Sequence, residues 1–175
     1  MSELTATATI RPARNDELPL LNAIEREAGR RFLQSPHPEI AFGKPLPRRR
    51  LSTFLAAGHL WVAVDENDHP IGFAALDDMG DALHLEEISV RLNQQGRGVG
   101  SRLINHVIHL ARREGYARLT LSTFRDVPWN QPYYERRGFT PIPDHRLPAR
   151  LRRLRMREAG VGIPVENRVC MEIVL

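Results

Sequence analysis

Several residue types and patterns that define other classes of protein are scarce or missing in this sequence. Its 175 residues include one cysteine, Cys170, so an internal disulfide and a four-cysteine metal site are both excluded. No apolar run approaches the ~20 residues that a membrane-spanning helix needs. Residues 1–8 lack the basic and apolar regions of a signal peptide. We therefore expect a cytoplasmic protein with no membrane partner.

The composition that remains is typical of a folded globular chain. Hydrophobic residues make up 42% of it and charged residues 26%. It contains neither an internal repeat nor a low-complexity segment, and its length suits one domain with its own hydrophobic core. The expectation is a single domain over residues 1–175, with a core at about 7–142 and a C-terminal extension at 145–175.

Positive charge is concentrated in two arginine clusters, at residues 48–50 and 146–157. The formal net charge is +4. A basic face can attract nucleic acid, an acidic substrate or the phosphates of a cofactor, or it can simply be solvated. The sequence has no aromatic-rich strand motif and no zinc-ligand spacing that would support nucleic-acid readout. Nucleic acid is therefore disfavoured as a partner.

Hydrophobic periodicity predicts helices and strands along the whole chain. Asn15 or Asp16 is the expected N-cap of a first helix, whose apolar positions recur at helical spacing as far as Phe32. Further helices are predicted at residues 47–57, 99–114, 131–136 and 148–159, and strands at residues 7–12, 60–64, 71–76, 82–90, 118–124, from Phe139, and 168–175. This order indicates a mixed α/β fold on one central sheet. The helix at 99–114 would join two parallel strands in a right-handed crossover.

The strongest chemical signal is a glycine-rich loop at residues 95–100, Gln-Gly-Arg-Gly-Val-Gly. It lies between a predicted strand and a long amphipathic helix, a position that offers free backbone N–H groups and a helix dipole to a phosphate. Glycines let a pyrophosphate approach the backbone closely, and Arg97 and Arg102 could add charge-assisted contacts. The alternative is a turn that only joins strand to helix.

Two well-known phosphate loops do not match this segment. The dinucleotide fingerprint would need a glycine where Ser101 stands, in the first strand–helix unit of a parallel sheet. The P-loop needs Gly-Lys-Ser/Thr, which does not occur in the chain. The loop is therefore predicted to hold a phosphate-bearing ligand of another kind.

Two segments together resemble the GNAT superfamily of N-acetyltransferases. Residues 88–103 are similar to the family's motif A, Arg/Gln-x-x-Gly-x-Gly/Ala, which Gln95, Gly98 and Gly100 meet. Residues 130–139, Asn-Gln-Pro-Tyr-Tyr-Glu-Arg-Arg-Gly-Phe, are similar to its second signature, an Asn followed by Phe/Leu-Tyr-Glu-x-x-Gly-Phe. The resemblance covers residues 7–142. The chain departs from the pattern at Leu92, where many members have proline, and in the short spacer after the asparagine.

The resemblance implies a GNAT-like fold, a three-layer α/β arrangement with a central, mixed, mostly antiparallel twisted sheet flanked by helices. It implies acetyl-CoA as co-substrate, no metal, and direct attack of a primary amine on the thioester. The implied acetyl-CoA-binding residues are Ile88, Ser89, Val90, Gln95, Gly96, Arg97, Gly98, Val99, Gly100, Ser101, Asn130 and Tyr134. A non-catalytic acyl-CoA-binding or protein-interaction module of the same fold is the alternative.

Three catalytic roles follow from this reaction. Tyr134 matches the position of the family's general acid, which would protonate the leaving thiolate. A backbone N–H of residues 88–90 would stabilise the oxyanion. Strand alternation places His84 and Glu86 on the same face, so Glu86 is our first candidate for the base and His84 the second. An ordinary polar strand face explains the pair equally well, and Glu25 is a further acceptor-site carboxylate.

The remaining candidates have structural interpretations. Cys170 lies in an apolar strand without an activating neighbour in sequence, so we expect a buried structural thiol. His106 and His109 lack a third ligand at metal-binding spacing. Leu147, Leu151 and Leu154 form a helical stripe that suits either a core or a homodimer interface.

The resemblance places the acceptor between the first two helices and the loop before the closing strand. These segments, residues 26–50 and 144–164, are rich in arginine, and Arg49 and Arg150 are the residues we single out. We expect the acceptor to be an amine-bearing small molecule or peptide with a carboxylate or phosphate.

Overall fold

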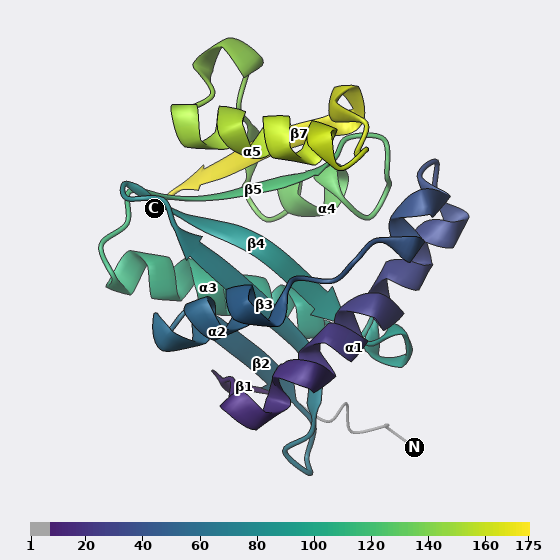
Figure 1. The fold of residues 1–175 in the computed structure, drawn as a ribbon. Coiled ribbons are helices and arrows are strands. Elements are labelled where there is room, and N and C mark those ends of the chain that lie inside the picture. Colours follow the sequence, from purple (N-terminus) through teal and green to yellow (C-terminus); the bar gives the residue numbers. More distant parts are fainter. Residues whose placement is uncertain (1–7) are drawn as a thin grey trace. The chain divides into compact units, whose positions relative to one another are not determined.

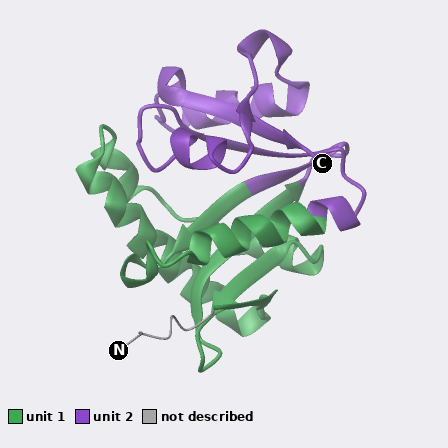
Figure 2. Ribbon diagram, turned by 180° about the vertical axis from the view of Figure 1, so that it is seen from behind, with its two compact units in different colours: residues 1–77, 86–110 green, residues 78–85, 111–175 purple. Residues whose placement is uncertain are grey.

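The computed structural model describes residues 8–175, so residue 7, the start of the first predicted strand, lies outside the described residues. The chain divides into two compact units (Figure 2). The first comprises residues 1–77, described from residue 8, together with residues 86–110. The second comprises residues 78–85 and 111–175. Each unit is described by itself.

The first unit is built on antiparallel strands. Ile10 lies opposite Ala63, and Val62 lies opposite Phe73 in the next pair. The intervening turn is closed by Asp65, whose Oδ1 accepts the backbone N–H groups of Asn67 and His69 at 2.9 Å. The strands are β1 (Thr9–Pro12), β2 (Leu60–Val64), β3 (Pro70–Asp78), of which all but the last residue belong here, and residues 86–90 of β4 (Ala82–Val90).

Helices cover both faces of this part of the sheet (Figure 1). On one face, α1 (Leu18–Gly29) and α2 (Arg48–Ala56) pack on β2 and β3. Their shared core contains Leu18, Leu21, Ile24, Leu51, Phe54, Leu60, Val62, Val64, Phe73 and Ala75. On the other face lies α3 (Val99–Arg113), whose His106 ring contacts Trp61 of β2 at 4.1 Å between centroids. This layering matches the three-layer prediction.

The start of the first helix differs from the prediction. Asn15 and Asp16 are not N-caps, because they lie with Glu17 in a 3-10 turn and α1 begins only at Leu18. The Glu17 carboxylate accepts the backbone N–H of Arg14 at 2.7 Å and pairs with Arg11 at 2.6 Å. That carboxylate caps the turn where the prediction placed an asparagine or aspartate. The helix also ends at Gly29, and further 3-10 turns follow at Arg30–Gln34 and Pro38–Phe42.

The second unit contains the parallel pair. Leu83 of β4 lies opposite Leu119 of β5 (Arg118–Phe124) in parallel register, which confirms the predicted crossover through α3. Strand β5 pairs antiparallel with β7 (Arg168–Val174), and β7 pairs with the short β6 (Thr140–Pro141). The strand expected from Phe139 is thus only two residues long, Thr140–Pro141.

Two helices complete this unit, α4 (Gln131–Glu135) and α5 (Ala149–Gly160). The leucine stripe of α5 is buried in a cluster that comprises Ile142, Leu147, Leu151, Leu154 and Cys170. Glu158, also on α5, accepts hydrogen bonds from Arg168 at 2.6 Å and from Ser122 at 3.0 Å. The stripe therefore belongs to the core of this unit, and a homodimer stays a prediction.

The fold class is confirmed. The chain is a mixed α/β protein with a seven-stranded, mostly antiparallel sheet and flanking helices. Short 3-10 turns lie at Leu92–Gln94, Asp144–Arg146 and Val165–Asn167. Within residues 8–175, none of the helices has both the length and the apolar composition that crossing a bilayer requires.

Candidate functional site

The glycine-rich loop connects the end of β4 to the first turn of α3, entirely within the first unit. Gly96 and Gly98 have φ angles of 75° and 82°, which other residues adopt only with strain. A Cβ on either glycine would have no atom within 4 Å, so backbone conformation rather than crowding requires them. Arg97 between them is exposed, and Val99 is buried at the helix start. Gly100 and Ser101 lie in the first turn of α3, the part of a helix that presents backbone N–H groups to an anion.

The loop fits the phosphate groups of acetyl-CoA. A helix N-terminus supplies N–H groups and a partial positive charge. The two glycines leave the space above the backbone open, and the exposed Arg97 adds a cation. The side chain of Gln95 ties the loop back to β4, because its Nε2 donates to the carbonyl oxygen of Val90 at 3.0 Å.

Two contacts that the sequence did not predict support this loop. Glu27 of α1 accepts hydrogen bonds from Arg91 Nη1 and from the backbone N–H of Leu92, both at 2.9 Å. Gly72 of β3 lies so close to Ser89 that a Cβ would be 2.9 Å from the Ser89 carbonyl oxygen. The loop is thus held from α1 and from β3. No local pattern signals these contacts, since their partners are far apart in the sequence.

Ile88, Ser89 and Val90 form the last residues of β4, directly before the loop. Ser89 is buried, and its hydroxyl donates to Glu87 Oε1 at 2.8 Å. This contact gives Glu87 a neighbouring partner on its own strand. Ile88 and Val90 are partly buried.

Glu86, the first candidate for the base, lies beside a cation. Arg50 Nη2 of α2 is 3.6 Å from Glu86 Oε1 and 3.2 Å from Asp77 Oδ2. The same guanidinium lies over the ring of Phe54, 4.7 Å from its centroid. Arg50 thus links two carboxylates on β3 and β4, a role that charge clustering alone did not reveal.

His84, the second candidate, lies in the second unit and is 2% exposed. Its Nδ1 shares a hydrogen bond of 2.9 Å with Thr120 Oγ1, the residue opposite it on β5. One ring nitrogen is therefore used inside the sheet.

Asn130 and Tyr134 also belong to the second unit. The Asn130 carbonyl oxygen accepts the backbone N–H groups of Tyr133 and Tyr134, at 2.9 and 3.2 Å, so its backbone starts α4. Tyr134 is buried, and its ring meets Phe139 edge-on at 5.8 Å. The partly exposed Tyr133 instead lies under Arg137, 3.4 Å from the ring centroid. Tyr134, not Tyr133, is thus the core member of the pair.

The thiol of Cys170 is unsuited to nucleophilic catalysis. Its side chain is buried, and burial raises the pKa of the thiol to about 11. A thiolate is the reactive form, so the thiol stays protonated at neutral pH. Among residues 8–175, no three histidine, cysteine or acidic side chains gather as metal ligands.

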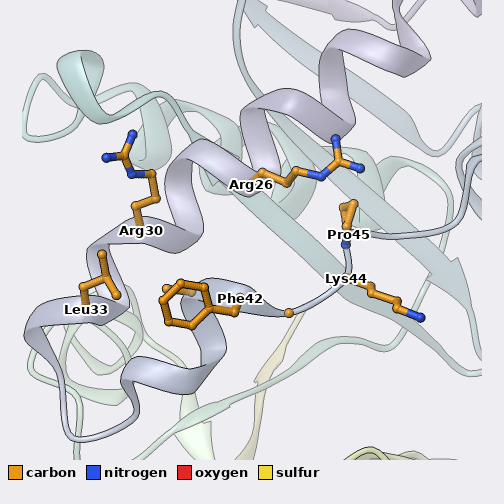
Figure 3. Close-up of a pocket in the computed structure, with 8 residues that line it drawn as sticks. Arg26, Arg30, Leu33, Phe42, Lys44 and Pro45 are labelled. Carbon is orange, nitrogen blue, oxygen red and sulfur yellow. The ribbon is translucent and has the colours of Figure 1, made fainter.

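A pocket of about 590 Å³ lies between α1 and the segment that leads to α2 (Figure 3). Arg26 projects from α1 and Arg30 from the start of the 3-10 turn that follows it, and Leu33 and Phe42 lie together at one end (Figure 3). The eight lining residues are Arg26, Arg30, Leu33, Ala41, Phe42, Gly43, Lys44 and Pro45. Arg49 and Arg150, the cations singled out from the sequence, do not line it.

Glu25 is hydrogen-bonded to Leu46, the residue that directly follows the pocket-lining segment 41–45. Leu46 N–H donates to both carboxylate oxygens of Glu25 at 3.0 Å, and Asn22 Nδ2 donates to the Leu46 carbonyl oxygen at 2.8 Å. Burial raises the pKa of Glu25 to about 7, although the Leu46 N–H and the charge of Arg26 act in the opposite direction. The predicted acceptor-site carboxylate therefore anchors the segment that forms the pocket wall.

The structure defines an α/β protein with a glycine-rich loop at the start of the helix that joins two parallel strands. Residues 21–139 match the model of the acetyltransferase (GNAT) family. Because this match covers more than half of the chain, the protein belongs to that family.

Individual relatives and structures agree with this assignment. The chain is 36% identical over 61 residues to the peptidyl-lysine N-acetyltransferase YjaB of Salmonella typhimurium, which is 35% of this chain and 39% of that protein. The matched part thus spans about two fifths of this curated relative.

The fold is shared with N-acetylglutamate synthase from Neisseria gonorrhoeae, solved with coenzyme A and N-acetyl-glutamate (TM-score 0.70, 22% identity, 97% of this chain and 35% of that chain). It is also shared with the PaiA N-acetyltransferase of Thermoplasma acidophilum, solved with coenzyme A (TM-score 0.69, 13% identity, 97% of this chain and 99% of that chain).

Proposed function

We propose that this protein is a single-domain N-acetyltransferase that moves an acetyl group from acetyl-CoA to a primary amine by direct attack. The observation that carries the proposal is the glycine-rich loop, with its two left-handed glycines at the N-terminus of α3, in a chain of the acetyltransferase (GNAT) family. The structural neighbours solved with coenzyme A support the same ligand.

Different residues would bind different parts of acetyl-CoA. Backbone N–H groups of residues 96–101 and the Arg97 guanidinium would hold the phosphates, while residues 88–90 of β4 would offer backbone hydrogen bonds to the rest of the molecule. Contacts of Glu27, Gly72 and Gln95 position the glycine-rich loop and the end of β4. When bound, acetyl-CoA supplies an acetyl thioester that an amine can attack.

Two side chains would transfer protons, Glu86 on β4 and Tyr134 on α4. Glu86 would accept a proton from the acceptor ammonium, directly or through a water, because only the neutral amine has a lone pair. Arg50 holds the carboxylate in place at 3.6 Å. Tyr134 would donate its phenolic proton to the departing thiolate, and a backbone N–H of residues 88–90 would stabilise the oxyanion. We assign His84 to the support of β4 and not to the role of base, because its Nδ1 shares a buried hydrogen bond with Thr120.

The acceptor is either a small molecule or a peptide. A sequence relative is named for acetylating lysine in proteins, and a structural neighbour was solved with an acetylated amino acid. Both acceptors present a primary amine, which is the part of the substrate that the proposed chemistry requires.

Thiol release from acetyl-CoA, measured over a panel of amines, tests the proposal. We expect release that depends on the amine and a drop in kcat of about 10²-fold or more in Glu86→Gln and in Tyr134→Phe. Tyr133→Phe is the matched control and should keep its kcat. Binding of acetyl-CoA without thiol release for any amine would favour a non-catalytic acyl-CoA-binding module instead.

A further inference from the structure

The pocket beside α1 combines positive charge with exposed apolar surface. Its lining includes three cations, Arg26, Arg30 and Lys44, and no acidic side chain. It also includes Phe42 and Leu33, which are 79% and 47% exposed. Phe42 is the most exposed large hydrophobic side chain of residues 8–175. Such a surface favours a ligand that is anionic at one point and apolar at another.

The cations of this pocket are not tied up in side-chain hydrogen bonds or ion pairs within the described residues, although the charge of Arg26 acts on the neighbouring Glu25. In residues 8–175, neither Arg26 nor Arg30 hydrogen-bonds or forms an ion pair with another side chain, and the same holds for Lys44. Some other arginines of the first unit are paired, as Arg11 is with Glu17 and Arg91 with Glu27. Guanidinium groups bind carboxylates through paired N–H donors. The guanidinium groups of Arg26 and Arg30 are therefore available to an external anion.

Hydrogen bonds anchor one wall of the pocket, the segment of residues 41–45. Asn22 and Glu25 hold Leu46 at both its backbone groups, which anchors the end of the wall formed by residues 41–45. The Gly43 N–H donates to the Ile40 carbonyl oxygen at 3.0 Å and closes the preceding turn. A volume of about 590 Å³ lies within the range of small-molecule sites.

We propose that this pocket binds the carboxylate and the apolar side chain of the acceptor, which is thus an amino acid or short peptide with a free carboxylate. Arg26 and Arg30 would hold the carboxylate, and Leu33 and Phe42 would cover the apolar group. This inference rests on the proposed function for the presence of an acceptor. The sequence analysis singled out Arg49 and Arg150 for the acceptor. The proposal assigns its carboxylate to Arg26 and Arg30 instead, because these two line one pocket.

Lys44 permits a binding test that does not depend on activity. It is the only lysine of the chain, so an N-hydroxysuccinimide ester labels Lys44 and the N-terminal amine alone, and the N-terminus serves as the internal reference. The probes are 3-phenylpropionate and 3-phenylpropanamide, which lack an amine and differ only in charge. We expect the carboxylate to slow labelling of Lys44, measured by peptide mass spectrometry, and the amide to have no effect.

A kinetic arm uses phenylalanine and phenylalaninamide as acceptors. The double variant Arg26→Gln/Arg30→Gln should raise the KM for phenylalanine by about tenfold to a hundredfold and leave the KM for acetyl-CoA unchanged. Arg48→Gln/Arg49→Gln, which removes two exposed arginines of α2 outside the pocket, is the matched control and should change neither constant.

The outcomes separate the two proposals. Protection of Lys44 by 3-phenylpropionate without thiol release for any amine would support the pocket and contradict the acetyltransferase proposal. Equal protection by both probes, or by neither, would overturn the carboxylate site even if thiol release is seen. An equal rise in the KM for phenylalanine in the two double variants would also overturn it, because general surface charge would then explain the effect.

Discussion

At the scale of single residues, backbone conformation decides what the glycine-rich loop can do. Gly96 and Gly98 adopt a left-handed conformation in open surroundings, so a side chain there would meet strain rather than a clash. The strain is local, and its effect on ligand binding is separable from its effect on stability. Gly58, at the end of α2, has a φ of 75° and equally open surroundings.

Gly98→Ala and Gly58→Ala therefore form a matched pair. Each should lower the free energy of unfolding by about 1–2 kcal/mol, because alanine is forced into the left-handed region. Only Gly98→Ala should weaken acetyl-CoA binding, measured by isothermal titration calorimetry. If both variants bind as the wild type does, the loop is a connecting turn and not the phosphate site.

Glu25 makes a second prediction at this scale, on pH. Its pKa in the folded protein is about 7, above the ordinary value of 4.5. The folded state therefore holds this proton more tightly than the unfolded state, and the stabilisation is complete below pH 4.5 and lost as the pH rises to 7 and beyond. The full effect is on the order of 3 kcal/mol.

Chemical denaturation of the wild type and Glu25→Gln across pH 4.5–8 measures this effect as a difference. The glutamine keeps an oxygen for the Leu46 N–H but does not titrate. The wild type should lose stability relative to the variant as the pH rises, and histidines that titrate in both proteins cancel. A difference that does not vary with pH would contradict the raised pKa.

At the scale of elements, α5 shows how one helix can combine a core face with a strongly basic one. Its leucines pack with Ile142 and Cys170, while Arg152, Arg153 and Arg157 are exposed. The same helix buries Glu158 against Arg168 and Ser122. The exposed arginines thus lie on the face opposite the core, whereas Arg155 pairs with Asp144, and the apolar stripe belongs to the core of the second unit.

Leu151→Ala should then lower the free energy of unfolding by about 2–5 kcal/mol, because it removes a buried side chain and leaves a cavity. Met156→Ala, on the same helix but 73% exposed, should change stability by no more than about 0.5 kcal/mol. Thermal or urea unfolding of both variants provides the measurement. A large effect of Met156→Ala with little effect of Leu151→Ala would place the packed face on the other side of α5.

At the scale of the whole molecule, the residues with proposed roles are found in both compact units. The glycine-rich loop, Glu86 and the cationic pocket belong to the first, and Tyr134 and His84 belong to the second. Each unit has a buried cluster of its own. A ligand that binds only the folded protein raises the free energy of unfolding, by an amount that grows with the ratio of ligand concentration to dissociation constant.

Coenzyme A at 100 times its dissociation constant should accordingly raise the free energy of unfolding by about 2.7 kcal/mol. Differential scanning fluorimetry over a coenzyme A titration measures the shift in Tm. Gly98→Ala should need more ligand for the same shift. The absence of any shift in the wild type would count against acetyl-CoA as the ligand of the loop.

The sequence by itself determined the features that depend on neighbouring residues. The alternation and helical spacing of apolar residues predicted most strands and helices, because burial of one face repeats with the local backbone geometry. The glycine-rich loop could be predicted for the same reason, since a strand, three glycines and a helix are contiguous. Prediction was wrong at Asn15 and Asp16, because the carboxylate of Glu17 makes the capping contact instead.

Only the tertiary structure decided which distant side chains meet. Glu27 and Arg91 are 64 positions apart, and neither shows in sequence that it holds the loop. The arginine clusters likewise left open which cations share a pocket. In the structure Arg26 and Arg30 line the pocket, and Arg49 and Arg150 do not. The physical reason is that local patterns specify which face of an element is buried, whereas contacts between elements depend on packing and on the reach of each side chain.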